Sequence, residues 1–406
     1  MNNMKKPKIR FKGFTDDWEQ RKLGEMGQTY TGLSGKAKDD FGHGQARFVT
    51  YMNVFSNPIS NPEMTEPIEI DPKQNEVEVG DVFFTTSSET PEEVGMSSIL
   101  LEKRGKTYLN SFCFGFRPSE KIDSYYLAYM LRSESTRAKI ILLAQGISRY
   151  NISKNKVMEI AVSLPSLDEQ KMIGQYFSQL DNLITLHQRK YEKLQIIKKS
   201  MLENCFPKNG EKVPKIRFSG FTGDWEQRKV GEVIEDYVEK TTVQNQYPVL
   251  TSSQQQGIVL QEDYFADRQV TTNDNVGYYV LPRGYFTYRS RSDTDLFVFN
   301  RNNLIDKGII SYYYPVFRPK NVDSNFLLRR LNNGIRSQVS MAAEGTGQHV
   351  LAHSKLKNME FLVPSVPEQK LIGAYFEILD HLITLHQSEL EKLQKIKKSL
   401  LERMFV

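Results

Sequence analysis

The sequence has few of the residues that would indicate a disulfide-stapled fold, a zinc site or a membrane segment. Cys113 and Cys205 are the only cysteines in 406 residues, which is too few for a disulfide framework or a zinc ribbon. No apolar run approaches the roughly 20 residues that span a bilayer, and the N-terminus shows no signal peptide. We therefore expect a cytoplasmic chain that does not bind a membrane.

Catalytic signatures are missing as well. An amino-methyltransferase carries an Asn/Asp-Pro-Pro-aromatic tetrapeptide, whereas residues 57–59 read Asn-Pro-Ile and residues 61–63 read Asn-Pro-Glu. The stretch from Gly32 to Lys36 has the wrong spacing for a phosphate-binding loop. His349 and His353 could share a helix face but have no third ligand. We expect no catalytic residue, no metal site and no cofactor bound by this chain.

The composition is that of a folded protein. Hydrophobic residues make up 39% of the chain, which is enough to build cores, and the length suggests two to three domains. The formal net charge of +5 is compatible with nucleic-acid binding without requiring it.

The chain contains two copies of one pattern. Residues 7–25 read PKIRFKGFTDDWEQRKLGE and residues 214–232 read PKIRFSGFTGDWEQRKVGE, with three differences. A second repeated block occupies residues 165–202 and 364–401. The segments between these blocks barely resemble each other. One scaffold that carries two different inserts suggests two similar tasks on two different targets.

The second repeated block predicts two long helices of about 35 residues. Ser166 with Glu169, and Ser365 with Glu368, match the capping box in which the glutamate returns to the N-cap. Apolar residues then follow at heptad spacing, and no Pro or Gly interrupts them after Gly174 or Gly373. A pseudo-two-fold arrangement would make the helices an antiparallel coiled coil, although pairing with another subunit stays open. The residues expected at the helix pair or at a subunit interface are Leu180, Leu183, His187, Leu194, Ile197, Leu379, Leu382, His386, Leu393 and Ile396.

The inserts read as mixed helix and strand, which makes the fold class α+β. Strands are expected over residues 82–86, 276–280, 285–288 and 296–299, and short helices over 124–132 and 324–331. The predicted organisation is a first domain over 1–163, a long helix over 164–206, a linker over 207–213, a second domain over 214–362 and a second long helix over 363–406.

The inserts also carry side chains that suit DNA. Arginine pairs with guanine, glutamine and asparagine pair with adenine, and lysine and hydroxyl groups contact phosphates. Any one polar loop residue is more often solvated surface, so the signal is collective; Gln254, Gln255 and Gln256 contribute to it. The candidate DNA-binding residues are Lys36, Lys38, Arg47, Ser87, Ser88, Ser148, Arg149, Tyr150, Tyr288, Arg289, Arg291, Ser292, Thr346, Gly347, Gln348 and His349.

Taken together, the repeated blocks resemble the DNA-specificity subunit of type I restriction-modification systems. The resemblance covers nearly the whole length. It rests on the block from Trp18 to Glu25 with its copy from Trp225 to Glu232, on Glu169-Gln170 and Glu368-Gln369 after a proline, and on Gly345-Thr346-Gly347-Gln348. The first half departs from that last motif, since residues 146–149 read Gly-Ile-Ser-Arg.

The resemblance implies two target-recognition domains, each of which reads one part of a split sequence in double-stranded DNA. It implies that the long helices set the spacing between the half-sites and dock two copies of a methyltransferase subunit. A motor-nuclease subunit would complete the complex. S-adenosylmethionine, ATP and magnesium would then belong to the partner subunits, and this chain would be non-catalytic.

Two other functions remain open from the sequence. The chain could be a self-contained DNA methyltransferase or nuclease with an unrecognised site. It could also be a coiled-coil interaction protein without a role in DNA binding.

Overall fold

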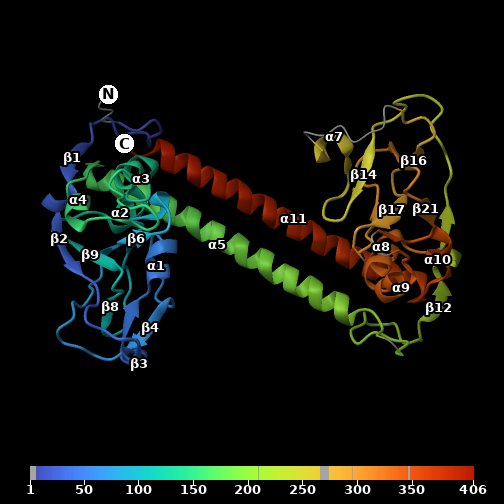
Figure 1. Ribbon diagram of the computed structural model, residues 1–406, viewed down its shortest axis with the longest axis horizontal. Coiled ribbons are helices and arrows are strands. Elements are labelled where there is room, and N and C mark those ends of the chain that lie inside the picture. Colours follow the sequence, from blue (N-terminus) through green and yellow to red (C-terminus); the bar gives the residue numbers. More distant parts are fainter. Residues whose placement is uncertain (1–5, 209, 266–273, 295, 346–347) are drawn as a thin grey trace. The chain divides into compact units, whose positions relative to one another are not determined.

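The computed structural model describes residues 6–208, 210–265, 274–294, 296–345 and 348–406. The chain forms two compact units, Met1–Arg189 with Gln387–Val406, and Lys190–His386. Two long helices, α5 (Leu167–Asn204) and α11 (Val366–Arg403), each contribute one part to each unit (Figure 1). These helices confirm the prediction from the second repeated block.

The first unit is built around a four-stranded antiparallel sheet. Its strands are β1 (Glu19–Lys22), β2 (Gly27–Thr31), β3 (Phe41–Val49), β4 (Thr65–Ile68), β5 (Val82–Thr85), β6 (Ser87–Ser88), β7 (Ser97–Ile99), β8 (Thr107–Leu109), β9 (Cys113–Pro118), β10 (Tyr150–Asn151) and β11 (Ala161–Leu164). Its helices are α1 (Tyr51–Ser56), α2 (Ser124–Met130), α3 (Glu134–Ile141) and α4 (Lys154–Met158), with short 3-10 turns η1 (Leu23–Glu25), η2 (Lys38–Asp40) and η3 (Pro91–Glu93). The main sheet has the order β2-β9-β5-β7, and β4-β3-β8 form a second sheet.

The second unit repeats this plan. Its strands are β12 (Glu226–Lys229), β13 (Ile234–Asp236), β14 (Leu250–Ser253), β15 (Gly257–Leu260), β16 (Tyr279–Pro282), β17 (Phe286–Tyr288), β18 (Arg291–Ser292), β19 (Phe299–Arg301), β20 (Lys307–Ile310), β21 (Val316–Pro319), β22 (His349–Val350) and β23 (Glu360–Val363). Its helices are α6 (Val230–Val233), α7 (Gln261–Tyr264), α8 (Ser324–Asn333), α9 (Arg336–Ala342) and α10 (His353–Asn358). The main sheet has the order β13-β21-β17-β19, which matches the first unit strand for strand.

The structure confirms a shared scaffold with different inserts. In both units the first repeated block (residues 7–25 and 214–232), which we call the Trp block, contains a strand that pairs with the strand before the long helix. Glu19 lies opposite Leu164 and Glu226 lies opposite Val363. The units differ beyond the main sheet, where β4-β3-β8 of the first unit is replaced by the pairs β14–β15 and β16–β20. The strands expected over residues 82–86 and 285–288 are present, whereas those expected over 276–280 and 296–299 begin only at Tyr279 and Phe299.

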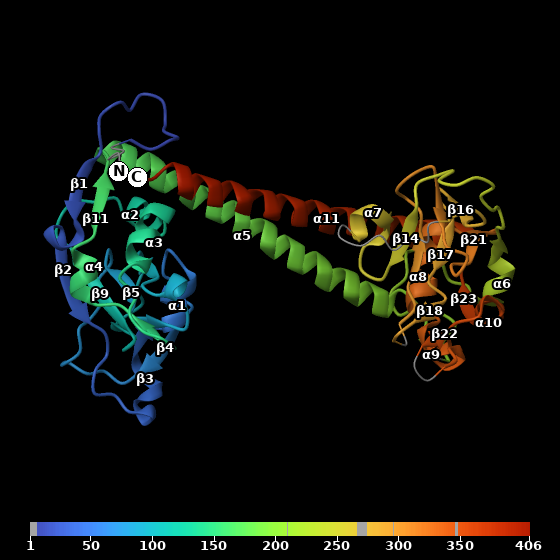
Figure 2. The same cartoon turned by 45° about the horizontal axis from the view of Figure 1, so that its top comes forward.

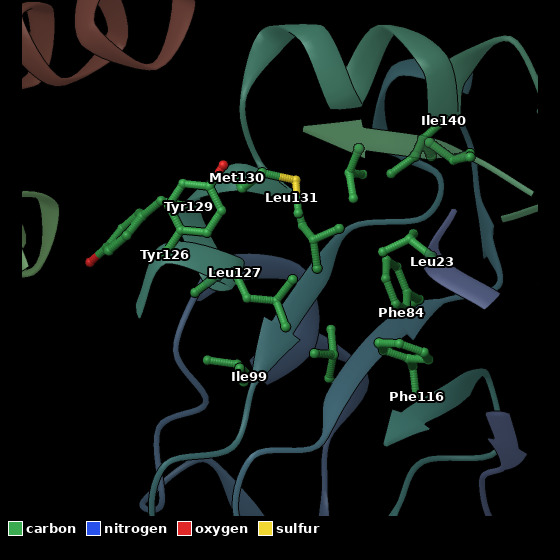
Figure 3. Packing of buried hydrophobic residues seen from close by; sticks show 14 of the residues in the cluster. Leu23, Phe84, Ile99, Phe116, Tyr126, Leu127, Tyr129, Met130, Leu131 and Ile140 are labelled. Carbon is green, nitrogen blue, oxygen red and sulfur yellow. The ribbon is translucent and has the colours of Figure 1, made fainter. Parts of the chain in front are cut away.

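Each unit buries its own apolar core between the main sheet and the helix that follows it. Figure 3 shows Leu127 and Leu131 from the α2 region lying over Ile99, Phe84 and Phe116 of the sheet, and all five are nearly inaccessible to solvent. The second unit has an equivalent core that includes aromatic rings of β17, β19 and β21 and the helix α8. Separate cores allow the two inserts to diverge without destabilising each other.

A buried ion pair attaches the Trp block to the start of each long helix. The Arg10 guanidinium donates two hydrogen bonds of 2.7 Å to the Glu169 carboxylate, which is fully buried. Arg217 makes the same contact with Glu368 at 2.7 and 2.8 Å. The sequence pattern predicted that these glutamates belong to capping boxes, in which the carboxylate accepts a hydrogen bond from the N-cap N–H. That assignment is wrong for their carboxylates, because a buried charge is stabilised far better by a bidentate arginine than by one backbone N–H.

The glutamine that follows each glutamate anchors a second element. The Gln170 side chain accepts a hydrogen bond from the Asp123 N–H at 3.0 Å and donates one to the Pro165 carbonyl at 2.9 Å. Gln369 repeats these contacts with Asp323 and Pro364. Asp123 and Asp323 in turn cap α2 and α8. The Glu-Gln pairs therefore hold the strand block, the short helix and the long helix together.

The long helices pack antiparallel within each unit. In the first unit, Asp181 near the start of α5 pairs with Lys397 near the end of α11 at 2.5 Å. In the second unit, Asp380 near the start of α11 pairs with Lys198 near the end of α5 at 2.6 Å. Phe405 and Phe206, which follow the ends of the two helices, are buried in the first and second core respectively.

Candidate DNA-recognition surfaces

The structure brings separate candidate segments together in each unit. In the first unit β6 pairs with β10, so that Ser88 lies opposite Tyr150. In the second unit β18 pairs with β22, so that Ser292 lies opposite His349. Residues more than 50 positions apart in sequence therefore form one short ladder in each half.

Each ladder ends in a turn that begins with glycine. Gly146 and Gly345 have φ angles of +146° and +121°. A Cβ on Gly146 would lie 2.0 Å from the Arg149 carbonyl oxygen, and one on Gly345 would lie 2.1 Å from that of Gln348. Only glycine fits these positions. The divergent first-half motif therefore has the same place as the second-half motif, of which Thr346 and Gly347 lie outside the described residues.

Arg149 and Gln348 occupy equivalent positions at these turns, and both side chains are exposed. The Arg149 guanidinium lies 5.7 Å from the ring centre of Phe112. The Gln348 amide nitrogen lies 3.5 Å from a carboxylate oxygen of Asp293. Ser148 beside Arg149 is exposed as well, whereas Tyr150 and His349 are half-buried.

A cavity of about 700 Å³ lies beside the second-unit ladder. Arg289, Arg291 and Gln348 line it together with Tyr312 and Tyr313. The Arg291 guanidinium lies 4.5 Å from the Tyr313 ring centre, and the two tyrosine rings are 4.3 Å apart. Flat rings and guanidinium planes offer stacking faces as well as hydrogen-bond donors.

The two tyrosines were not among the sequence candidates. Their signal is the run Tyr312-Tyr313-Tyr314 in the turn between β20 and β21, and it could have been found. Gln254 and Gln255 line the same cavity and follow β14, in agreement with their place among the polar residues of the insert.

Four candidates have buried side chains and act within the fold. Tyr288 is fully buried in the second core, where its hydroxyl donates to the Leu351 carbonyl at 3.3 Å and burial raises its pKa. Ser88 donates to Glu93 at 3.1 Å, and Ser292 donates to the Leu296 carbonyl at 3.1 Å. Ser87 is buried as well. These side chains shape the ladders rather than face solvent.

Three basic candidates belong to another part of the first unit. Lys36 forms an ion pair with Asp71 at 2.9 Å, and Arg47 donates to the Thr65 hydroxyl at 2.6 Å. Lys38 is exposed in η2, just before β3. Figure 2 shows β3 and β4 at the end of the first unit that is remote from the start of α5. Two of these three cations are thus already engaged by protein groups.

The candidate helix residues fall into three groups by their exposure to solvent. Leu180 and Leu379 are buried, and Leu194 and Ile197 pack against the second core. Leu183 and Ile396 are 46% and 37% exposed. His187, Leu382, His386 and Leu393 are half-buried.

A family model described as the type I restriction modification DNA specificity domain matches residues 15–195 and 222–395. The chain belongs to that family. It is 23% identical over 95% of its length to a Methanocaldococcus jannaschii protein assigned as the MjaX specificity subunit of a type I restriction enzyme, and covers 92% of it. It is 25% identical over 75% of its length to the MjaVIII specificity subunit of the same organism, and covers 74% of it.

The fold agrees with this assignment. The crystal structure of a type I restriction-modification S subunit from M. genitalium superimposes with a TM-score of 0.61, over 99% of both chains and at 12% identity. The chain is therefore a DNA-specificity subunit of a type I system, and the alternative of a self-contained methyltransferase or nuclease is not favoured. Within the described ranges, no helix is long and apolar enough to cross a membrane, and no three His, Cys, Asp or Glu side chains group as metal ligands.

Proposed function

We propose that each half of this specificity subunit reads one part of a bipartite DNA target through its glycine-initiated turn. The observation that carries the proposal is the pair of matching ladders, which present Arg149 in one unit and Gln348 in the other. Arginine forms two hydrogen bonds with guanine, and glutamine forms two with adenine. Different side chains at one backbone position would give the two half-sites different sequences.

In the second unit, Arg289, Arg291, Tyr312 and Tyr313 extend this reading surface. Their cavity opens beside the turn that carries Gln348. The arginines supply base or phosphate contacts and the tyrosines supply stacking or hydroxyl contacts. In the first unit, Lys36, Lys38 and Arg47 lie on a separate part of the domain, where the exposed Lys38 would contact a flanking phosphate.

Exposed apolar residues on the long helices suggest where the methyltransferase subunits dock. In the first unit Met172, Tyr176, Leu183 and Leu186 of α5 are exposed at heptad spacing. In the second unit Leu371, Ile378 and Leu385 of α11 are exposed seven residues apart, and Leu371 and Leu385 are equivalent to Met172 and Leu186 in the repeat. A solvent-exposed apolar stripe of this kind marks a protein interface. Two matching stripes would seat two copies of one partner.

The rest of the assembly follows from the family. S-adenosylmethionine would be bound by the methyltransferase subunits and ATP by a motor-nuclease subunit, and magnesium would also belong to the partner subunits. The complex would act in the cytoplasm, where its DNA substrate lies.

The reading turns can be tested by exchange. Arg149→Gln should change the base preferred at one position of one half-site, and Gln348→Arg should change one position of the other. Each loss on the original target should be about 10- to 100-fold, since a good bidentate contact contributes about 1–3 kcal/mol. Binding of the subunit with its methyltransferase partners to a randomised DNA library measures both preferences.

Matched controls separate reading from folding. Lys121→Gln and Lys320→Gln alter exposed cations that lie outside the turns, and should leave both preferences unchanged. If Arg149→Gln and Gln348→Arg both weakened binding without shifting preference at either half-site, the turns would not be base readers.

A further inference from the structure

The second unit contains a basic cavity outside the reading surface. It has a volume of about 880 Å³ and lies between the end of α5, the end of α8 and the start of α9. Its basic residues are Lys198, Lys199, Lys208, Arg330 and Arg336, and its one carboxylate is Glu203. Lys198 is already paired with Asp380 at 2.6 Å, so the remaining cations dominate the cavity.

Arg330 is the unusual member of this group. Its side chain is only 4% exposed, and its guanidinium lies 5.1 Å from the Phe206 ring centre and 5.6 Å from that of Phe361. Nothing in the described part of the chain accepts a hydrogen bond from its buried Nε. Burial lowers its pKa to about 10, so the group is still charged at neutral pH. A buried charge without a counterion is costly unless something else satisfies it.

Two other arginines that the protein largely encloses, Arg132 and Arg137, donate to backbone carbonyls. Arg132 donates to the carbonyls of Ser97 and Val54 at 2.7 and 2.8 Å, and Arg137 donates to that of Gly95 at 2.7 Å. The fold thus provides carbonyl acceptors for these two arginines. Arg10 and Arg329 each have one buried guanidinium nitrogen without a partner in the described ranges, but each is bound to a carboxylate. The Nε of Arg330 has no such acceptor among the described residues.

The first half shows that the scaffold does not need an arginine here. Asp123 and Asp323 cap equivalent helices, and seven residues further on the first half has Met130 where the second has Arg330. Met130 is fully buried in the first core. An apolar side chain therefore satisfies the packing at this position, and the charge of Arg330 calls for a separate explanation.

We propose that the cavity binds a phosphate group, with Arg330 as its anchor and Lys199, Lys208 and Arg336 at its rim. A guanidinium presents paired N–H donors that match phosphate oxygens, and several cations favour a dianion over a single carboxylate. The phosphate belongs either to the DNA backbone, a source that rests on the proposed function, or to a soluble phosphate ester. The site is absent from the first half, so it makes the two halves unequal.

The first test measures binding of inorganic phosphate and pyrophosphate to the full chain by calorimetry. Arg330→Met installs the residue of the first half and should weaken binding at least tenfold. Lys199→Gln combined with Lys208→Gln changes only exposed residues and should weaken it severalfold, which keeps the test valid if Arg330→Met fails to fold. Lys193→Gln, an exposed position on the same helix outside the cavity, should leave binding unchanged.

The second test identifies the source of the phosphate. The affinity for a non-specific duplex is measured across a salt series with wild type and Arg330→Met. Loss of one backbone phosphate contact should lower the slope of log K against log salt by about 0.9. An unchanged slope together with lost phosphate binding would identify a soluble ester.

The proposal is overturned if wild type binds neither phosphate nor pyrophosphate and the salt slope does not depend on Arg330 or the two lysines. The proposal is also overturned if Arg330 becomes shielded from solvent when a methyltransferase subunit binds but not when phosphate is added. Arg330→Met should keep the order of preference among target sequences, so a failure of the phosphate site and a failure of the reading turns give different results.

Discussion

At the tip of the first-unit ladder the turn from Gly146 ends in Arg149, and at the tip of the second-unit ladder the turn from Gly345 ends in Gln348. The backbone pairing is the same, and both glycines are required by a close approach to a carbonyl oxygen. The side chains that face solvent differ. Under the proposed function, this difference would let the two halves recognise different bases with one backbone plan.

The frame behind the turns differs far less between the halves. Arg10 with Glu169 and Arg217 with Glu368 have almost identical geometry. The helix contacts differ by one partner, because Asp181 accepts a hydrogen bond from the Tyr129 hydroxyl where Asp380 accepts one from Arg329. Equal anchors should respond equally to mutation, and unequal partners should not.

The largest effect is expected at the buried anchors. Arg10→Met and Arg217→Met should each lower the free energy of unfolding by about 3–5 kcal/mol, because each leaves a buried glutamate without its counterion. Denaturant unfolding of the full chain measures both. Lys8→Met and Lys215→Met, exposed and equivalent positions nearby, should have little effect. Clearly unequal losses for the two arginines would show that the frames are not equivalent.

The next effect is expected on DNA. Arg291→Ala with Arg289→Ala should reduce affinity about 10- to 100-fold through one half-site only, since the arginines line the second-unit cavity. Binding to duplexes with either half-site scrambled gives the comparison. Equal loss at both half-sites would contradict the assignment of one reader to each half.

A smaller effect is expected in the helix pair. Asp380→Asn loses attraction to two cations and should cost about 2 kcal/mol, whereas Asp181→Asn loses one cation and should cost about 1 kcal/mol. The side chains of Asp380 and Asp181 are 33% and 27% exposed, so solvent screening keeps both losses of stability small. Thermal unfolding should reproduce the order, and the reverse order would show that Tyr129 contributes more than Arg329.

The smallest effect concerns the two junctions between a long helix and a Trp block. The Ile216 N–H donates to the Asn204 carbonyl at 2.9 Å, and the Ile9 N–H donates to the Arg403 carbonyl at 2.9 Å. Ile9 therefore contacts the end of α11 as Ile216 contacts the end of α5. A circular permutant that joins the ends and opens at residue 209 should lose less than about 1 kcal/mol. A permutant that fails to fold would contradict the equivalence of the junctions.

Much of this architecture could be predicted from the sequence. The repeat fixed the two-part organisation, heptad spacing predicted both long helices, and segments around Arg149 and Gln348 were candidates before the fold joined them to their ladders. Local sequence patterns predicted the wrong contact where the true partner is distant in the sequence. Ser166 and Glu169 satisfied a local capping rule, yet the carboxylate binds Arg10, 159 residues away.

The sequence was also a poor guide to which of these side chains are buried. Tyr288 lies beside two arginines in sequence, but the alternation of a strand turns its ring into the core. Leu183 follows heptad spacing but is exposed, because α5 carries more than one apolar stripe with the same period. Periodicity alone cannot say which stripe faces the paired helix.

The central claim, one reader in each half, is tested most directly by mapping methylated bases across the genome of cells that carry this chain with its methyltransferase subunit. Wild type should produce one split motif of two short specific parts around a fixed gap. Arg149→Gln should change one part and leave the other part and the gap as they were. A motif that changes in both parts, or a continuous motif without a gap, would contradict the account.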